Sequence, residues 1–528
     1  MSEQNDNGGK SRGSGRVTIF DYGSQYTQLI ARRIREREVY SEIVPYNTAA
    51  STLRADPPAG IILSGGPDSV FAPGAPGIDP DVFKLGIPVL GICYGMQLMA
   101  QTLGGKVEPG EGGEYGKTEL SAGGGDGSCC ALFAEVPGKS TVWMSHGDRV
   151  SSLPPGFSAA ASSANCPCAA MYDPGRKFYA IQFHPEVVHS EYGGKVLSNF
   201  VFGICGCKPE WKLASWIDDT VERLRAQTDG GEVVLGLSGG VDSSVVAMLL
   251  HRAIGDRLHC IFVDNGLLRL GEAAQVETMF RGKYGLDLHV ARAAGRFYKA
   301  LEGISDPEAK RKTIGRLFID VFAEEARKFS HCRFLAQGTI YPDVIESSST
   351  TKGPSHTIKS HHNVGGLPPD LKFELIEPLR DLFKDEVRAV GRELGMDGEL
   401  LDRQPFPGPG LGVRIPGEVT EEKVGILQKA DAIVREEVAK LPQYKTIWQT
   451  FAVLLPVKTV GVMGDRRTYE YTCAVRSIDS VDAMTADWTR LPWETLATIS
   501  NRIINEVRGI NRVVYDISSK PPATIEWE

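Results

Sequence analysis

The stretch GLSGGVDSSVV, residues 236–246, follows the apolar run 233–235 and leads into a run with helical periodicity. Its glycines let backbone N–H groups approach a phosphate, its serine hydroxyls add donors, and the helix N-terminus adds a favourable field. A glycine-rich turn that binds nothing would account for Gly239 and Gly240, but not for the whole set of hydroxyls. The stretch therefore predicts a strand, a phosphate-binding loop and a helix, the repeating unit of a parallel α/β sheet.

Two better-known phosphate loops do not fit this stretch. The lysine of G-x-x-x-x-G-K-[ST] is missing, because Val241 and Asp242 occupy that region. The pattern G-x-G-x-x-G of a dinucleotide loop is absent as well. The Asp242 carboxylate suits Mg²⁺, a hard cation. The missing positive charge must come from elsewhere, and the candidates are Lys359, in a lid-like stretch at 352–369, and Lys384, which opens an amphipathic helix. Taken alone, either lysine is more often a solvated surface charge.

Composition argues against several classes of protein. The length of 528 residues suggests about three domains, and the net charge of -8 gives no reason to expect nucleic-acid binding. The sequence contains no run of about 18 apolar residues, so it predicts no membrane span. Residues 1–15 are polar and lack the apolar core of a secretory signal, so we expect a disordered tail and a cytoplasmic protein. The close cysteine pairs at 129/130, 166/168 and 205/207 lack zinc-site spacing, which favours incidental thiols.

Strand and helix patterns alternate along most of the chain. The expected strands are the apolar runs 17–20, 60–63, 88–92, 233–237, 258–263, 286–290 and 333–336, with helices that include 243–254 and 271–284. After the stiff stretch 405–410 the order changes to a helix at 420–439, strands at 450–457 and 468–477, a helix at 494–507 and a strand at 512–517. We expect the glycine-rich, acidic stretch 104–127 to be a surface loop.

These patterns predict an α/β protein with two doubly wound, mostly parallel sheet domains and a small C-terminal α+β domain. The expected boundaries give a tail at 1–15 and domains at 16–207, 208–403 and 404–528. No internal repeat is evident.

A second candidate site lies at Gly91-Ile92-Cys93-Tyr94-Gly95, between a strand and a helix. The sharp turn of this G-x-C-x-G pattern would expose Cys93, and the helix N-terminus would favour its thiolate. A buried core cysteine would explain the pentapeptide equally well. His184 and Glu186, after the strand-like run 180–183, supply a base and its orienting carboxylate. The stretch 64–67 can offer N–H groups to an oxyanion.

These motifs together resemble the class I glutamine amidotransferase domain. The matching segments are LSGGP at 63–67, GICYGMQ at 91–97, SHGD at 145–148 and QFHPE at 182–186. The resemblance implies that Cys93 is the nucleophile, His184 the general base and acid, and Glu186 the orienting residue. It implies hydrolysis of glutamine to glutamate and ammonia through a thioester. It also assigns residues to the oxyanion hole and the bound glutamine: Gly66, Tyr94, Gln97, Ser145, His146 and Gly147.

The S-G-G-x-D-S form of the opening stretch resembles the loop of the N-type ATP pyrophosphatases. In that family ATP is split between its α and β phosphates, and the loop holds the departing pyrophosphate. The resemblance implies ATP as a co-substrate and Mg²⁺ as a cofactor, with Asp242 as metal ligand. The ATP-binding residues that it implies are Ser238, Gly239, Gly240, Val241, Asp242, Ser243, Ser244, Val263, Lys359 and Lys384.

Four further segments are similar to the GMP synthetase family: GTIYPDVIES at 338–347, IKSHHNVGGLP at 358–368, DRQPFPGPGLGVR at 402–414 and the chain end at 519–528. This resemblance implies that xanthosine monophosphate (XMP) is adenylated and then aminated at C2 to give GMP. It implies a homodimer formed through residues 404–528. The XMP-binding residues that it implies are Arg269, Asp343, Lys520 and Glu526. The sequence alone would read Lys520 as a solvated terminal residue.

Three other functions compete with this interpretation. An NAD synthetase uses the same phosphate loop, but the chain end and the cysteine domain argue against it. A non-catalytic nucleotide-binding regulator would have no need of the complete triad. A cysteine peptidase would leave the phosphate loop unexplained. Residues 1–15 and 108–127 lie outside the strongest motifs, so any partner or regulation that they serve stays open.

Overall fold

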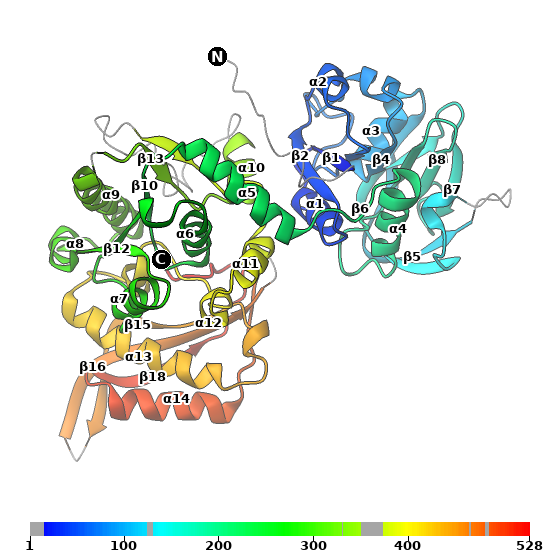
Figure 1. Cartoon of the computed structure of the whole chain (residues 1–528). Coiled ribbons are helices and arrows are strands. Elements are labelled where there is room, and N and C mark those ends of the chain that lie inside the picture. The colour runs from blue at the N-terminus through cyan, green and yellow to red at the C-terminus, as the bar shows by residue number, and fades with distance from the viewer. Residues whose placement is uncertain (1–14, 124–129, 330, 350–372, 464–465, 481–484) are drawn as a thin grey trace. The chain divides into compact units, whose positions relative to one another are not determined.

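The computed structural model describes residues 15–123, 130–329, 331–349, 373–463, 466–480 and 485–528. It divides into two compact units, Met1–Asp219 and Thr220–Glu528 (Figure 1). Among the described residues, no helix is both long enough and apolar enough to cross a membrane. Each unit is described below by itself.

The first unit is built on a nine-stranded sheet in the order β2-β1-β3-β4-β9-β8-β7-β5-β6. The first five strands in this order are parallel, as their registers show. All four residues of β3 and of β4 are buried, because both faces of this half of the sheet are covered. The parallel strands are β1 (Arg16–Asp21), β2 (Tyr40–Pro45), β3 (Gly60–Leu63), β4 (Val89–Ile92) and β9 (Phe178–Ile181). The helices are α1 (Thr27–Arg35), α2 (Ala50–Ala55), α3 (Tyr94–Thr102) and α4 (Gly193–Ser198).

The prediction of a surface loop at 104–127 is wrong over most of that range. Residues Lys106–Ala122 form β5, which pairs with β6 (Lys139–Ser152) and extends the sheet in antiparallel fashion together with β7 (Ser158–Ser162) and β8 (Ala170–Asp173). Glycine and proline normally mark loops. Here the glycines and the proline fit into the strand because the pairing of β5 with β6 is irregular between Pro109 and Glu114. Such β-bulges are tolerated where a strand bends.

The second unit contains the predicted second parallel sheet, in the order β12-β11-β10-β13-β14. Its registers are parallel throughout, so the fold class is confirmed. The strands are β10 (Val233–Gly236), β11 (Leu258–Asp264), β12 (Asp287–Arg292), β13 (Phe334–Ala336) and β14 (Glu374–Ile376). The helices are α5 (Leu213–Thr228), α6 (Val241–Ile254), α7 (Glu272–Glu277), α8 (Ala294–Leu301), α9 (Pro307–Ala326), α10 (Tyr341–Ser349), α11 (Lys384–Glu393) and α12 (Gly398–Leu401). Helix α5 begins in the first unit and ends in the second.

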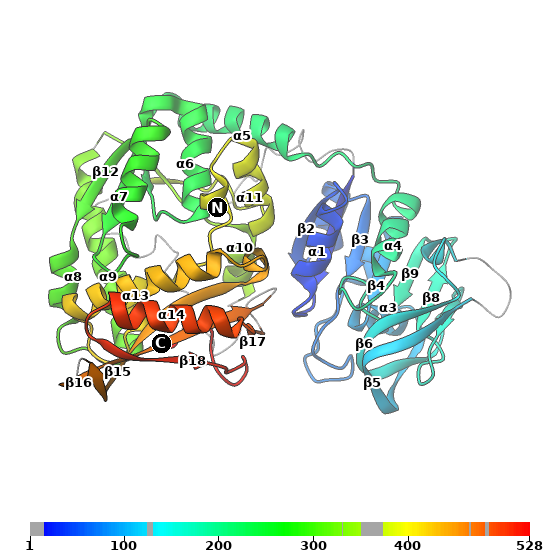
Figure 2. The same cartoon turned by 90° about the horizontal axis from the view of Figure 1, so that it is seen from below.

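The C-terminal part of this unit is the small α+β element that the sequence predicts. Strands β15, β16 and β17 are antiparallel, and β18 joins β16 in parallel. Helices α13 and α14 lie side by side against this sheet in both views (Figures 1 and 2). The elements are α13 (Glu421–Ala439), β15 (Gln449–Met463), β16 (Arg466–Asp479), β17 (Asp487–Trp488), α14 (Trp493–Glu506) and β18 (Ile510–Asp516).

One hydrophobic core joins the parallel sheet to the C-terminal sheet. It contains Val234 of β10 and Ile314 of α9 together with Val434 of α13 and Ile510 of β18. The boundary that we predict at residue 404 therefore lies within a single compact unit. Residues that act on one ligand can come from both sides of that boundary.

Candidate active sites

Cys93 lies on a strained turn between β4 and α3. Its φ is 52° and its ψ is -106°, a backbone conformation that non-glycine residues rarely adopt. The neighbouring glycines permit the turn, because a Cβ at Gly91 would lie 2.7 Å from the Gly95 carbonyl oxygen and a Cβ at Gly95 would lie 2.3 Å from that of Leu63. This is the geometry by which a sharp turn presents a nucleophile above the carboxyl ends of the strands.

His184 and Glu186 form a buried pair beside Cys93. His184 Nδ1 lies 2.7 Å from Glu186 Oε1, and the side chains are 5% and 0% exposed. Burial would lower the pKa of His184, but the Glu186 carboxylate and hydrogen bonds to Cys93 and Glu186 outweigh it, so the pKa lies well above its usual value. The ring of Tyr26 packs edge-on against His184 at 5.1 Å. The imidazole is therefore fixed in orientation and biased toward the charged form.

A pocket of about 320 Å³ opens at the thiol. The seven predicted residues that line it are Gly66, Cys93, Tyr94, Gln97, Ser145, His146 and Gly147. The N–H of Tyr94 is the first of helix α3 and has no acceptor within that helix. The Cys93 Sγ atom lies 3.6 Å from the Ser145 carbonyl oxygen, as a donor to it. The structure thus gathers seven of the predicted amidotransferase residues around one concave site, with His184 and Glu186 beside Cys93 but not among the lining residues.

Pro67, of the predicted stretch 64–67, also lines the pocket, and four further lining residues were not predicted: Asp68, Ser69, Tyr115 and Asp148. The Gln97 amide donates to the Asp148 carbonyl at 3.0 Å, and the Ser69 hydroxyl donates to the Asp148 carboxylate at 2.5 Å. Asp148 ends the quoted SHGD segment, so the sequence contained the signal but assigned it no role. Tyr115 lies in the stretch that was expected to be a loop, and its side chain is 73% exposed.

Serine hydroxyls of the second unit's phosphate loop form hydrogen bonds within the loop. The Ser243 hydroxyl lies 2.9 Å from that of Ser238 and accepts from the Ser238 N–H at 3.1 Å. The Ser244 hydroxyl donates to the Gly240 carbonyl at 2.6 Å. Gly239 has a φ of +72°, which favours glycine. These bonds shape the loop at the start of α6, with its N–H groups at the helix N-terminus.

Lys384 brings a positive charge to this loop. Its Nζ atom lies 2.6 Å from each carboxylate oxygen of Asp242, so the predicted lysine and the predicted metal ligand meet in one ion pair. Lys359, the other predicted lysine, lies outside the described residues. Val263 is buried in β11, next to β10 in the same sheet.

Two residues beside the loop were missed by the sequence interpretation. A Cβ at Gly338 would lie 3.1 Å from the Ser243 nitrogen, so the chain after β13 passes directly against the loop. Arg403 donates to the Gly239 carbonyl at 3.3 Å and forms an ion pair with buried Glu272. Both residues belong to segments quoted for the family resemblance, at 338–347 and 402–414.

Two of the four predicted XMP residues, Arg269 and Glu526, are linked through Pro405 and Gln449. Arg269 is 5% exposed, donates to the Pro405 carbonyl at 3.4 Å and lies 4.4 Å above the ring of Phe406. Gln449 donates both to the Pro405 carbonyl at 3.1 Å and to Glu526 at 2.8 Å. Burial, followed by repulsion from Arg403, lowers the pKa of Arg269 to about 9. Its buried Nε atom has no hydrogen-bond partner among the described residues.

Glu526 is held by a fully buried arginine. Arg414 Nη2 lies 2.9 Å from Glu526 Oε1, and Arg414 Nε donates to Oε2 at 3.0 Å. Asp343 and Lys520 lie on other elements. Asp343 accepts from the Ile340 N–H in the first turn of α10, and Lys520 pairs with Ala486 through the backbone.

Known protein families match three parts of the chain. Residues 18–204 match the family described as "Glutamine amidotransferase class-I", residues 211–267 match "NAD synthase", and residues 436–527 match "GMP synthase C terminal domain". The middle match covers β10, the phosphate loop, α6 and β11, a unit that an NAD synthetase would share. The third match, to a GMP synthase domain, argues against an NAD synthase.

Curated relatives match nearly the whole chain. Proteins named GMP synthase [glutamine-hydrolyzing] from Synechococcus sp. and Lacticaseibacillus rhamnosus are each 56% identical to it, over 97% of this chain and 96% and 98% of their own lengths. A protein of the same name from Geobacillus kaustophilus is 56% identical over 97% of this chain and 99% of its own.

Proposed function

The chain belongs to the family of glutamine-hydrolysing GMP synthases, a family of ligases, and from that membership we propose that it aminates XMP to GMP. ATP adenylates the C2 oxygen of XMP, and ammonia from glutamine displaces AMP. The products are GMP, AMP, pyrophosphate and glutamate, which is the final step of guanine nucleotide synthesis. One observation carries this proposal: a single chain combines the Cys93 pocket, the phosphate loop and a C-terminal part that matches this family.

In the first unit, the proposed role of Cys93 is attack on the carboxamide carbon of glutamine. His184 takes the thiol proton and returns a proton to the leaving ammonia, while Glu186 holds the ring. The raised pKa of His184 supports this role, because it favours an imidazolium beside a thiolate. Gly66 and Tyr94 line the pocket at the thiol, and we propose that their N–H groups stabilise the oxyanion.

In the second unit, the loop Ser238–Ser244 is proposed to bind the pyrophosphate of ATP. The loop lies at the N-terminus of α6, where an anion is favoured. The donor set near the loop fits Mg²⁺, since this ion commonly uses one or two carboxylates together with substrate phosphates. Asp242 would hold the ion, which would neutralise charge on the departing pyrophosphate. Lys384 would then contribute its charge to the phosphates.

The acceptor site is proposed to lie beside Arg269 and Glu526, which Pro405 and Gln449 connect. The buried guanidinium of Arg269, with an unpaired Nε atom, supports a role with the phosphate or purine of XMP. The Arg414–Glu526 pair supports a fixed carboxylate for a ring N–H. Asp343 and Lys520 stay predicted XMP residues from the family resemblance, as does Lys359 for ATP.

The decisive experiment is a reaction of the full chain with XMP, ATP, Mg²⁺ and glutamine, in which GMP is followed by chromatography. We expect GMP, AMP and glutamate in equal amounts. Replacing XMP by nicotinic acid adenine dinucleotide tests the NAD synthetase alternative, and we expect no product from it. Absence of GMP with active glutamine hydrolysis would refute the acceptor. The homodimer through residues 404–528 and the cytoplasmic location stay predictions, which sedimentation and cell fractionation would test.

A further inference from the structure

A cluster of histidine, carboxylate and thiol side chains lies at the amino-terminal edge of the second unit's parallel sheet. Glu232 directly precedes β10, His259 is the second residue of β11, and His331 and Cys332 precede β13. The three strands are parallel, so their first residues meet at one edge of the sheet. Strand β10 has four residues, which separates this edge from the phosphate loop by about 13 Å along the strand. The cluster is therefore distinct from the proposed ATP site.

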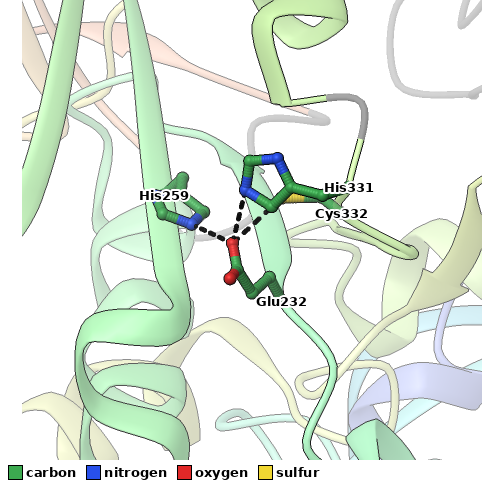
Figure 3. Close-up of side chains that lie close together, drawn as sticks. All are labelled: Glu232, His259, His331 and Cys332. Atoms are coloured by element: carbon green, nitrogen blue, oxygen red, sulfur yellow. Dashed lines mark hydrogen bonds and ion pairs between the residues drawn. The ribbon is translucent and has the colours of Figure 1, made fainter.

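The Glu232 carboxylate is the centre of the cluster (Figure 3). Its Oε2 atom lies 2.7 Å from His259 Nε2, 2.7 Å from His331 Nε2 and 3.9 Å from Cys332 Sγ. The four ligand atoms all lie within 4.8 Å of one another. Cys332 is buried, Glu232 and His259 are partly buried, and His331 is exposed. The site is open to solvent on the side of His331 and closed on the side of the thiol.

Hydrogen bonding alone does not satisfy this arrangement when the rings are neutral. A neutral imidazole has one N–H, and His259 has a carboxylate at each nitrogen: Asp287 Oδ2 at 2.6 Å from Nδ1 and Glu232 Oε2 at 2.7 Å from Nε2. If the N–H serves Asp287, then a lone pair on Nε2 faces a carboxylate oxygen. A cation between these two atoms removes the conflict, because both become its ligands.

The surroundings orient the rings as metal sites commonly do. Ligating histidines usually donate the other ring N–H to a carboxylate, which fixes the tautomer. Asp287 stands in this position for His259 and also lies 3.0 Å from His289 Nε2. The buried ring of Phe329 stacks on His259 at 4.8 Å and meets His289 edge-on at 4.7 Å. Packing and a carboxylate thus hold His259 with Nε2 toward Glu232.

We propose that Glu232, His259, His331 and Cys332 bind one divalent transition-metal ion of the zinc type, which clamps the amino-terminal ends of β10, β11 and β13. Two imidazoles, one carboxylate and one thiolate make a four-ligand set that suits Zn²⁺ or Co²⁺. Mg²⁺ prefers oxygen ligands and is not expected here. Four protein ligands leave no position for a reacting water, so the expected role is structural.

The ligand atoms, which all lie within 4.8 Å of one another, must adjust their separations to accept the ion. With metal–ligand bonds of about 2.1 Å, tetrahedral nitrogen and oxygen ligands lie about 3.4 Å apart. The two N···O separations of 2.7 Å must therefore widen by a fraction of an ångström, while the S···O separation of 3.9 Å must shorten slightly. His331 and Glu232 can make this change, because their side chains are 57% and 35% exposed.

The test is a Co²⁺ titration of the full chain, followed by absorption and completed by Zn²⁺ competition. A Cys93→Ser background removes the thiol of the amidotransferase pocket. We expect one Co²⁺ per chain, tetrahedral d–d bands and a thiolate-to-cobalt charge-transfer band, all abolished by equimolar Zn²⁺ and unchanged by Mg²⁺. Cys332→Ser should remove the charge-transfer band. His331→Gln, at an exposed position that does not threaten folding, should weaken Co²⁺ binding at least about tenfold, and Asp287→Asn about 10- to 100-fold.

Two controls make the outcome specific. His251→Gln, on α6 and outside the cluster, should leave the Co²⁺ spectrum and affinity unchanged. A chain in which the histidines at 356, 361 and 362 are all replaced by glutamine should also behave like the parent, since the four ligands of the proposed site all remain in it. The proposal is overturned if the parent binds no Co²⁺ or Zn²⁺. It is equally overturned if Cys332→Ser and His331→Gln bind as the parent does.

Discussion

Lys384 Nζ lies 2.6 Å from both carboxylate oxygens of Asp242, across 142 positions of the chain. The pair joins the first turn of α6 to the first residue of α11. Each partner has its own proposed task at the phosphates, so the pair holds both groups at the loop before ATP binds. A partly exposed ion pair of this kind contributes little stability. Its role is to position the two side chains, so substitutions at Asp242 or Lys384 should change the reaction rate more than the free energy of unfolding.

Asp242→Asn should lower the rate of XMP-dependent pyrophosphate release by at least about 100-fold, because the proposed Mg²⁺ ligand loses its charge. Glutamine hydrolysis by the first unit should persist. Pyrophosphate release measured by a coupled assay decides the matter. Asp256→Asn, on the surface after α6, is the matched control. Unchanged pyrophosphate release in Asp242→Asn would exclude the metal role.

Cys93→Ala should reduce glutamine-driven GMP formation by about 10⁴-fold or more, because no thioester can form. GMP formation from added ammonium chloride should stay within about twofold of the parent. The two rates are compared at one pH by chromatography. Cys205→Ser removes a partly buried thiol outside the pocket and should preserve both activities. Loss of both activities in Cys93→Ala would mean that the division of labour is wrong.

Glu186→Gln should lower the pKa of His184. The carboxylate charge that raises this pKa disappears while the burial that lowers it remains. In the parent, a folded-state pKa above 6.5 stabilises the folded state at low pH. This contribution is complete below the unfolded pKa of about 6.5 and is lost as pH rises through the folded pKa.

The pKa prediction is checked by NMR titration of ¹³C-labelled histidine, and by the pH dependence of the first unit's unfolding free energy. The parent and Glu186→Gln should differ most below about pH 6.5 and converge as pH rises. Glu135→Gln, whose side chain is 81% exposed and pairs with Lys195, is the control. Identical His184 titration in Glu186→Gln and the parent would contradict the assignment of the cause.

Arg403→Gln should raise the KM for ATP and destabilise the second unit by about 3 kcal/mol, because buried Glu272 would lose its charged partner. The contact to the Gly239 carbonyl would be lost as well. Steady-state kinetics and denaturant unfolding measure the two effects. Arg392→Gln breaks an exposed pair with Asp402 and should change neither quantity.

Deletion of Glu528 should raise the KM for XMP and cost about 1–3 kcal/mol of unfolding free energy in the second unit. The Lys310 side chain is fully buried and pairs with the Glu528 carboxylate, while Arg311 donates to the Glu528 main-chain oxygen. Without these contacts the segment that carries Glu526 should loosen. Lys312→Gln, at an exposed position of the same helix, is the control. An unchanged KM for XMP would separate the chain end from the acceptor site.

Contiguous motifs were the predictable part of this protein. The strands before Ser238 and Cys93 were correct because short apolar runs next to glycine-rich turns have few other interpretations. Residues 91–95 and 182–186 also located the pocket, since each motif follows a parallel strand and such strands end at one edge. The Lys384 contact with the loop followed the family resemblance and could not be derived from local pattern.

Contacts between distant segments were the unpredictable part. Strand β5 was missed because its glycines suit a loop locally, and only the partner β6 makes it a strand. Arg403 and Gly338 reach the phosphate loop through packing that no spacing encodes. Cys332 escaped notice because its prospective partners Glu232 and His259 come from other strands. Sequence spacing detects metal ligands within one loop far better than ligands spread along a sheet edge.

The contact between Glu528 and Lys310 has a consequence for folding during protein synthesis. Synthesis proceeds from the N-terminus, and domains generally fold as they emerge. The first unit can complete its pocket while the ribosome is still adding the second, but the contacts of Glu528 cannot form until that residue has been added and has left the ribosome. A nascent chain would thus contain a finished site for glutamine before it contains a finished site for the acceptor of the nitrogen. Restraint of glutamine hydrolysis until the second unit is complete would spare the cell a futile loss of glutamine at every round of translation.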